Sequence, residues 1–454
     1  MNLIPLLAVF VPWARTPLSL FTAIYLACCI LSLEVQVLTS TGIGTLHDLV
    51  PFNLAAAVAA TVWQQRRGTP AWRWRNAVGA VAPWPAVAGV AALVMAVNIA
   101  LPVQAADPYQ LERIVQIERV GTLDYNPSAD PKVNIAGAFY ELVIADLKQI
   151  PVAGPLLVRM HGVLGLLLYL LTLASVRTWF GQGSSPWARS LLLVVPVVFQ
   201  QLVLIKNDLF FAAPSLVVLA WLVAPKDDVS WVDLLWAGWL AGLVVGGKGV
   251  NFPLAIVLVL GVWIFQRGRL LSATAWIGLG GAVGAVCSGL LLVGAQNLRV
   301  YGDVFASGPM GEMTKWYDSP ADAVTGVLRF AISLGDMGQV TTRLWPGRGG
   351  WGGTFGLPLV WALAVLIANA ASARDARRAL ACTGGFLLLF ALGFPDADLA
   401  HRIVLGPGLL LLVVAQQVSA RGPARWPHLA AIPVVLLSAA QSAPCARACC
   451  WLEH

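Results

Sequence analysis

The chain has 454 residues, of which 58% are hydrophobic and only 11% are charged, and its mean hydropathy is +0.77. A water-soluble protein carries far more charge on its surface, so this composition excludes an ordinary soluble enzyme. The net charge of +7 does not come from a Lys/Arg-rich block with interleaved aromatic residues, which argues against a nucleic acid partner. The composition predicts an all-α polytopic membrane protein in contact with membrane lipids.

Apolar runs near twenty residues recur along the chain, and each is long enough to cross about 30 Å of hydrocarbon. We expect thirteen transmembrane helices, at about 16–36, 48–64, 80–102, 152–175, 190–205, 209–224, 231–247, 252–266, 273–295, 354–373, 379–394, 403–418 and 428–444. Two long stretches separate some of them, at about 103–150 and 296–352. The sequence thus predicts one transmembrane domain over 1–444 and a tail over 445–454, whose last three residues resemble an expression tag.

The basic residues of the short loops indicate which side of the membrane is cytoplasmic. With thirteen spans, one side holds the basic residues of seven segments, which are marked by Arg15, Arg66, Arg177, Lys226, Arg267, Arg377 and Arg421. Only four of the 22 carboxylates fall on that side. Seven lie in the first long loop and five in the second. The prediction is therefore an exterior face that is rich in carboxylates.

The first long loop is expected to contain two helices. Leu111, Ile114 and Ile117 recur near helical spacing, and the stretch 135–150 has a comparable apolar stripe. Such patterns predict amphipathic helices that lie in the membrane interface. The alternative is a pair of helices that pack against their protein neighbours.

Ionisable residues at the ends of membrane spans are costly and often functional. The expected topology brings five groups of them to the exterior face. These groups are Asp107; Lys206, Asn207 and Asp208; Lys248; Arg299 and Tyr301; and Asp396, Asp398, His401 and Arg402. A carboxylate can act as a base or bind a metal, and a set of cations can hold a phosphate. The structural alternatives are local ion pairs, a Lys248 side chain that extends to the interface, and a helix cap at Asp107.

Common signatures of soluble enzymes are absent from the sequence. It has no Walker-type phosphate loop, which argues against ATP-driven transport, and no His-Glu-x-x-His zinc motif. The glycine-rich stretch 347–353 is interpreted as an exterior loop at the entrance of a span. Near the C-terminus, Cys445, Cys449 and Cys450 leave a disulfide or metal role open.

Five short segments follow one another in a characteristic order. They are Asp107–Arg113 (Asp-Pro-Tyr-Gln-Leu-Glu-Arg), Asn207-Asp208, Gly247-Lys248-Gly249, Asn297–Asp303 and His401–Pro407. In this order they resemble motifs of bacterial membrane glycosyltransferases of the GT-C superfamily. These include relatives of protein O-mannosyltransferases and of lipid A aminoarabinose transferases. Gln110 stands where the family often has His.

The resemblance implies a GT-C-like fold and a sugar donor linked to polyprenyl phosphate. Such a donor is used at the periplasmic face of the bacterial inner (plasma) membrane, with a cell-envelope glycan, lipid or protein as the acceptor. A donor of this kind needs cations at the interface and an apolar groove for its tail.

The resemblance also assigns expected roles to single residues. Asp107 would be the general base, and Lys248, Arg299 and Arg402 would bind the donor phosphate. The expected substrate contacts are Tyr109, Glu112, Arg113, Asn207, Asp208, Tyr301 and His401. A divalent ion, Mg²⁺ or Mn²⁺, is left open, with Asp107 and Asp208 as its candidate ligands.

Two other functions fit parts of the same pattern. A polysaccharide ligase or polymerase that uses a polyprenyl-diphosphate glycan would share the basic exterior pocket but needs no carboxylate at Asp107. A secondary transporter usually shows internal repeats and charged or broken helices near the membrane midplane. The sequence shows no convincing repeat, and its charges are expected at one face.

Overall fold

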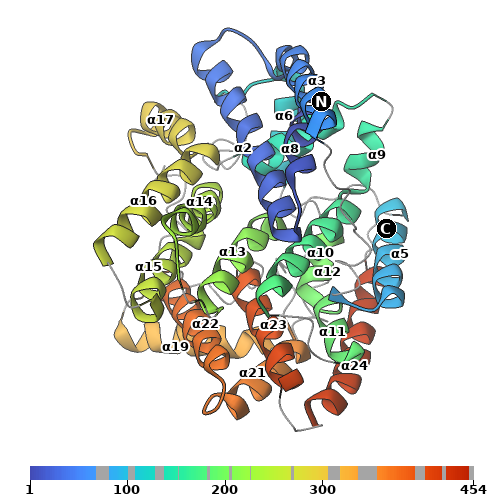
Figure 1. The fold of residues 1–454 in the computed structure, drawn as a ribbon, viewed down its shortest axis with the longest axis vertical. Coiled ribbons are helices and arrows are strands. Elements are labelled where there is room, and N and C mark those ends of the chain that lie inside the picture. Colours follow the sequence, from blue (N-terminus) through green and yellow to red (C-terminus); the bar gives the residue numbers. More distant parts are fainter. Residues whose placement is uncertain are drawn as a thin grey trace.

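The computed structural model describes residues 1–67, 81–100, 108–127, 138–151, 153–180, 185–203, 207–224, 226, 228–266, 270–304, 317, 319–335, 355–393, 404–421 and 426–448. Every regular element in these ranges is a helix (Figure 1). The expected all-helical class is therefore confirmed for the described part of the chain.

The helices run through the chain in three groups. The first group is α1 (Leu3–Phe10), η1 (Val11–Trp13), α2 (Pro17–Thr41), η2 (Leu46–Leu49), α3 (Val50–Arg67), α5 (Trp84–Ala100), α6 (Pro108–Val120), α8 (Phe139–Lys148) and α9 (Gly154–Arg159). The second is α10 (His161–Phe180), α11 (Pro186–Ser190), η3 (Leu191–Leu193), α12 (Pro196–Val203), α13 (Asp208–Val223), α14 (Trp231–Gly247), η4 (Gly249–Asn251) and α15 (Pro253–Gln266). The third is α16 (Leu270–Cys287), α17 (Leu290–Tyr301), α19 (Pro320–Gly335), α21 (Leu357–Asn369), α22 (Arg374–Gly393), α23 (Leu405–Arg421) and α24 (Trp426–Ala448).

Several helices are long and apolar enough to cross a membrane. Among the described residues these are Pro17–Thr41, Leu46–Gln64, His161–Phe180 and Arg374–Gly393, with a fifth if α16 and α17 form one bent span. The other apolar helices in the described ranges are 10–17 residues long. The expected number of thirteen long spans is therefore not reproduced.

Two of the expected spans are not straight helices. The stretch 190–205 holds the end of α11, then η3 and α12, and the break falls just before Pro196, whose nitrogen carries no hydrogen to continue a helix. The stretch 273–295 bends by 65° between α16 and α17. Gly289 occupies this bend with a φ of +90°, a conformation that glycine adopts at little cost.

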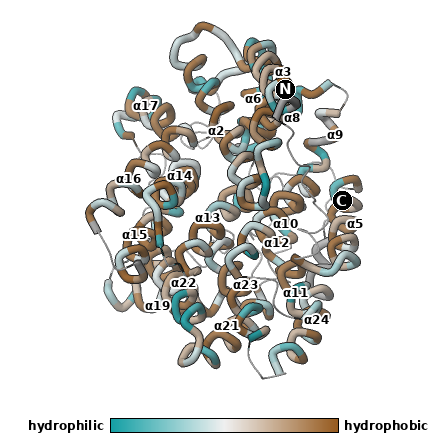
Figure 2. The backbone as a smooth tube through the Cα atoms, in the orientation of Figure 1, coloured by the Kyte–Doolittle hydropathy of each residue, from teal (hydrophilic) through white to brown (hydrophobic). Residues whose placement is uncertain are grey.

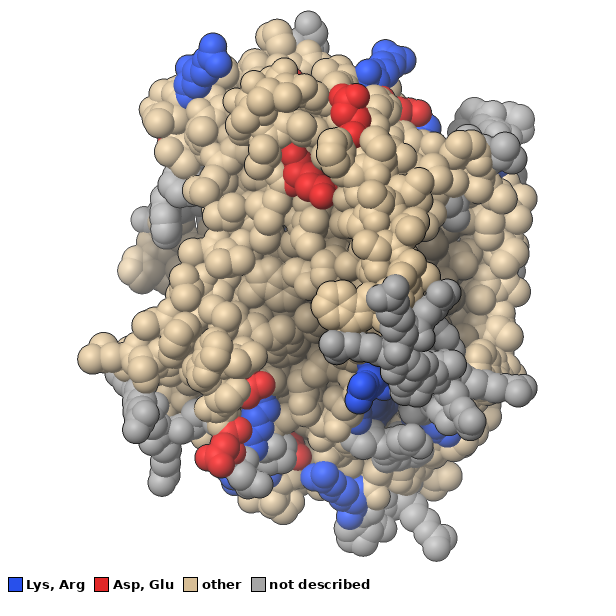
Figure 3. Space-filling model, turned by 45° about the horizontal axis from the view of Figure 1, so that its top comes forward, with Lys and Arg blue, Asp and Glu red and all other residues tan. Residues whose placement is uncertain are grey.

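The surface carries many large apolar side chains. Phe52, Leu271 and Ile332 are 73%, 85% and 74% exposed, and hydrophobic residues run along most helices (Figure 2). In the view of Figure 3 the described charged side chains lie toward the top and bottom, and none of them shows in the broad band between. Exposed apolar surface on this scale suits contact with lipid rather than water.

α13 is the central helix of the bundle. All of its residues from Asp208 to Val223 are buried, as expected for a helix that is apolar on every side. It packs on α10, α14 and α23 (Figure 1). Its first residues therefore lie inside the protein and not in a solvated loop.

α14 and α16 pack with their backbones in contact. A Cβ atom on Gly238 would lie 2.3 Å from the carbonyl oxygen of Ile277, and one on Gly242 would lie 2.1 Å from that of Gly281. Small residues at a spacing of four allow this approach between membrane helices. The contact holds α14 in place up to its C-terminal end, which is followed by Lys248.

α8 is enclosed by protein. Its residues from Phe139 to Asp146 are all buried, and it packs on α1, α2, α6 and α9. The two helices expected in the first long loop are thus present, but α8 follows the alternative of packing against protein neighbours. α6 is more open, since Ile114 is buried while Glu112 is exposed.

The beginning of the chain fixes one end of α8. The Asp146 carboxylate accepts hydrogen bonds from the backbone nitrogens of Asn2 and Leu3 at 2.7 and 2.8 Å, and pairs with the Met1 ammonium group at 2.5 Å. A carboxylate at the start of α1 satisfies N–H groups that have no partner within the helix. α1, which precedes the first expected span, therefore anchors α8 (Figure 1).

Candidate functional site

Charged and polar side chains from three helix ends meet in the buried part of the molecule. Lys248 forms an ion pair with Asp208 and donates to Asn207 Oδ1 at 3.4 Å. Asn207 Nδ2 donates in turn to Glu141 Oε1 at 3.5 Å. With Arg113, whose charge also acts on Glu141, we call these five residues the polar cluster. All but Lys248 are less than 9% exposed.

Local sequence explains why Lys248 and Asp208 meet. Asp208 is the first residue of α13, where a negative charge is favoured, and Lys248 follows the last turn of α14, where a positive charge is favoured. Gly247 allows the two helix ends to approach, because a Cβ there would lie 2.3 Å from ring atoms of Phe211. The ion pair therefore depends on a glycine at the end of α14.

Arg113 lies on α6 with only 2% of its surface exposed. Its Nη1 donates to Gln116 Oε1 at 3.2 Å, but Nε and Nη2 are buried without a hydrogen-bond partner among the described residues. Burial lowers the pKa of Arg113 to about 10, against the opposing effect of Glu141 and Asp124. Gln110 Oε1 on the same helix is also buried without a partner. A guanidinium with unused donors is suited to bind an anion.

Glu141 lies on α8 and is only 3% exposed. Burial raises the pKa of Glu141 to about 7, although its backbone hydrogen bond, the charges of Arg113 and Lys248 and the Asn207 amide favour the ionised form. Its Oε2 atom has no hydrogen-bond partner. A carboxyl group with this pKa can accept or release a proton near neutral pH.

Sequence reasoning placed Glu141 among the polar positions of a loop helix and did not select it as a site residue. A signal for it was present, because Phe139, Tyr140, Leu142 and Val143 surround it in the sequence. A carboxylate within such an apolar stretch is either turned outward by the helix or buried, and a buried carboxylate needs partners for its charge.

The structure brings together four of the expected site residues, Arg113, Asn207, Asp208 and Lys248. Glu112 and Arg299 are exposed, and among the described residues no hydrogen bond or ion pair joins them to the polar cluster. The hydroxyl group of Tyr301 lies 3.2 Å from that of Tyr125, in a contact between the two long loops. Tyr109 lies in the first turn of α6, and its side chain lies outside the described part.

Other expected site residues lie outside the described ranges. These are Asp107, Lys206, Asp396, Asp398, His401 and Arg402. The roles of Asp107 as a base and Arg402 as a phosphate ligand stay predictions. Within the described ranges no group of three or more His, Cys, Asp or Glu residues is arranged to hold a metal ion. Cys28, Cys29, Cys287 and Cys382 are buried free thiols, in keeping with a packing role.

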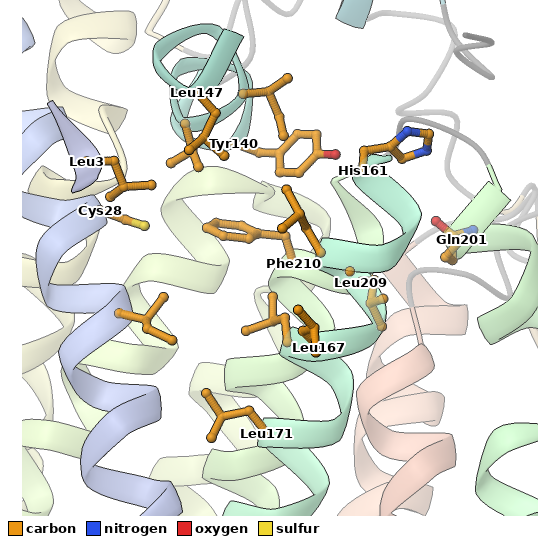
Figure 4. Close-up of a pocket in the computed structure, with 16 residues that line it drawn as sticks. Leu3, Cys28, Tyr140, Leu147, His161, Leu167, Leu171, Gln201, Leu209 and Phe210 are labelled. Atoms are coloured by element: carbon orange, nitrogen blue, oxygen red, sulfur yellow. The ribbon is translucent and has the colours of Figure 1, made fainter. Parts of the chain in front are cut away.

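A cavity of about 290 Å³ lies between α1, α2, α8, α10, α12 and α13 (Figure 4). Its lining is mostly aliphatic, with polar atoms from Tyr140, His161 and Gln201. The cavity and the polar cluster share two helices, because Tyr140 precedes Glu141 on α8 and Phe210 follows Asp208 on α13. The rings of Tyr140 and Phe210 are 5.5 Å apart.

Comparison with known proteins adds no further constraint. A scan against models of protein families, a search of curated proteins and a search of solved structures each found no match. The resemblance to GT-C glycosyltransferases therefore rests on the order of short segments alone.

Proposed function

We propose that this protein is a membrane glycosyltransferase of the GT-C type. It moves a sugar from a polyprenyl-phosphate donor to a lipid, glycan or protein acceptor at the exterior face of the bacterial inner membrane. The observation that carries the proposal is Arg113, a buried arginine with unused donors that lies near Glu141 and Lys248 at the ends of apolar helices. Such a place suits an anionic group attached to a lipid chain.

The donor phosphate is assigned to Arg113 together with Lys248. Arginine presents a planar fork of donors that matches two phosphate oxygens, and Arg113 has Nε and Nη2 unused. Lys248 is already paired with Asp208, so it contributes an N–H donor to the phosphate rather than a net positive charge. The order of the sequence motifs makes Arg402 and Arg299 further candidates for binding the same phosphate.

The reaction is a direct displacement at the anomeric carbon. The acceptor hydroxyl oxygen forms the new glycosidic bond, the bond to the donor phosphate oxygen breaks, and the hydroxyl proton passes to a carboxylate. The polyprenyl phosphate leaves with the bonding electrons, and the cations stabilise its growing charge. The resemblance makes Asp107 the proposed base. Glu141 is the other candidate for the base, because burial raises its pKa to about 7.

Asn207 and Asp208 have supporting roles in this proposal. Asn207 holds Glu141 through its amide, and Asp208 holds Lys248. For Asp208 to bind Mg²⁺ or Mn²⁺ together with Asp107, it would have to release Lys248. Activity measured with and without EDTA decides whether the reaction needs such an ion.

The test uses purified protein in nanodiscs with a radiolabelled sugar on polyprenyl phosphate and an extract of cell-envelope glycolipids as acceptors. Transfer by the wild type and its reduction by at least tenfold in Arg113→Gln and Asp107→Asn are expected. Arg119→Gln is the matched control, because Arg119 lies on the same helix as Arg113 but is exposed, and it should keep full activity. Transfer at the wild-type rate by Arg113→Gln would remove the phosphate assignment.

A polysaccharide ligase or polymerase is the second candidate. The observation in its favour is that two cations, Arg113 and Lys248, act on the same buried Glu141, and a diphosphate carries more negative charge than a monophosphate. Such an enzyme needs no carboxylate at Asp107. Loss of activity in Asp107→Ala supports the glycosyltransferase, whereas retained activity with a polyprenyl-diphosphate glycan supports the ligase.

A further inference from the structure

The cavity beside the polar cluster has a polar end and an apolar end. Figure 4 shows Tyr140, His161 and Gln201 toward one side, with the Tyr140 hydroxyl group pointing toward His161, while Leu3 and Cys28 lie on the opposite side. None of the described residues that line the cavity is Asp, Glu, Lys or Arg. The space therefore suits an uncharged molecule with distinct polar and apolar ends.

Gln201 is the decisive residue of the polar end. It is 3% exposed, and neither its Oε1 nor its Nε2 has a hydrogen-bond partner within the described part of the chain. A carboxamide both donates and accepts, and burial of such a group without partners is unfavourable. A partner that satisfies both atoms must also donate and accept, as a hydroxyl or another amide does.

We propose that this cavity binds a single-chain lipid whose polar end is an uncharged amide or hydroxyl group. Gln201 Nε2 donates to the oxygen of the lipid's polar group, and Gln201 Oε1 accepts its N–H or O–H. The aliphatic side chains of α10, including Leu164, Leu168 and Leu171, contact the chain. The site is separate from the polar cluster and does not depend on glycosyl transfer.

The position of the cavity along α10 fits an amphiphile in a bilayer. His161 is the first residue of α10, and Leu171 lies ten residues further, which is about 15 Å along a helix. The polar end thus lies at the end of a membrane-length helix and the apolar end lies deeper. Leu167, on the rim, is 51% exposed, so the chain enters sideways from the lipid.

Other lipids fit this cavity less well. A pure hydrocarbon chain leaves both amide atoms of Gln201 unpaired. A fatty-acid carboxylate brings a charge where no described lining residue is Lys or Arg. The cavity volume of about 290 Å³ is near the lower limit of sites for small ligands, so it holds the polar end and the adjoining part of one chain, whose far carbons pass Leu167 into the lipid. It leaves no room for a second chain or a sugar head.

The binding test compares four chains of equal length on the purified protein. Oleamide and oleyl alcohol are the expected ligands, 1-octadecene lacks the polar group, and oleate is charged at pH 8. Native mass spectrometry of the protein in detergent gives the occupancy and Kd for each probe. Oleamide and oleyl alcohol are expected to bind at least tenfold tighter than 1-octadecene and oleate.

Substitution then assigns the preference to Gln201. Gln201→Met keeps the length of the side chain and removes its hydrogen bonds, so oleamide should lose its tenfold advantage while 1-octadecene binds as before or better. Leu168→Trp fills the cavity from α10 and should reduce the binding of every probe. Gln296→Met, whose Nε2 contacts Leu123 outside the cavity, is the matched control and should keep the preference.

Three results would overturn the proposal. The first is equal binding of oleamide and 1-octadecene to the wild type, which needs no variant. The second is an unchanged preference for oleamide over 1-octadecene in a Gln201→Met variant whose Tm equals that of the wild type. The third is no binding of any probe at millimolar concentration, which would mean that ordered water alone forms the hydrogen bonds of Gln201.

Discussion

Lys248 and Asp208 join the C-terminal end of α14 to the N-terminal end of α13. Each charge lies at the helix end that its sign favours, and the two neutralise one another where Asp208 is only 4% exposed. The pair also presents Lys248 to Asn207 and, through it, to Glu141. This ion pair thus links α13, the central helix of the bundle, to Glu141, whose pKa is raised to about 7.

Removal of one partner of this pair is expected to destabilise the protein. Asp208→Asn leaves the ammonium group of Lys248 without its counter-charge, and Lys248→Met leaves a buried carboxylate, at a cost of about 3 kcal/mol each. The double variant should be more stable than the sum of the two changes predicts, because both charges are gone. Thermal unfolding in detergent for the four proteins of this cycle measures the coupling, and additive effects would contradict it.

Glu141 is expected to make stability depend on pH. Its pKa is raised from 4.5 to about 7, so between these values the folded protein holds a proton that the unfolded chain has released. The resulting stabilisation is fully present below pH 4.5 and is lost as pH rises through about 7, with a slope of at most about 1.4 kcal/mol per pH unit. Glu141→Gln lacks this slope.

The measurement for Glu141 is the Tm of wild type and variant at pH 5, 6, 7 and 8. The Glu141→Gln variant should gain relative to the wild type as pH rises. Glu112→Gln is the control on the exposed side of α6 and should follow the wild type throughout. A constant difference in Tm between Glu141→Gln and the wild type would contradict the raised pKa.

Gly242 and Gly278 provide a matched test of helix packing. Gly242→Ala adds a Cβ methyl group that would lie 2.1 Å from the Gly281 carbonyl oxygen, so α14 and α16 must move apart. Gly278→Ala on α16 meets nothing within 4 Å and should be neutral or stabilising by about 0.5–1 kcal/mol. A lower Tm for Gly242→Ala alone is expected, and equal effects of the two substitutions would show that the helices do not touch.

Arg113→Lys tests the fork of donors proposed to hold the donor phosphate. Lysine keeps the positive charge but offers no planar pair of N–H groups, so we expect the KM for the polyprenyl-phosphate donor to rise about tenfold, or about 1.4 kcal/mol. Arg119→Lys, on an exposed position of the same helix, should leave KM unchanged. An unchanged KM in Arg113→Lys would indicate that charge alone matters there.

Part of the candidate site follows from the sequence. The expected topology put Asn207, Asp208 and Lys248 at the ends of apolar spans on one face, and the structure joins them in the polar cluster. Glu141 and Gln201 were not selected. Their importance comes from burial without full hydrogen bonding, and burial depends on which distant helices cover a side chain.

The sequence by itself determined that the chain forms apolar helices, because hydrophobic runs without water must satisfy their backbone hydrogen bonds internally. It also determined the helix ends where charges gather. Only the tertiary structure decided that α8 is enclosed, that α11, η3 and α12 break an expected span before Pro196, and that Gly289 bends another. These outcomes depend on contacts between segments far apart in the chain, and local hydropathy does not encode which apolar face meets which.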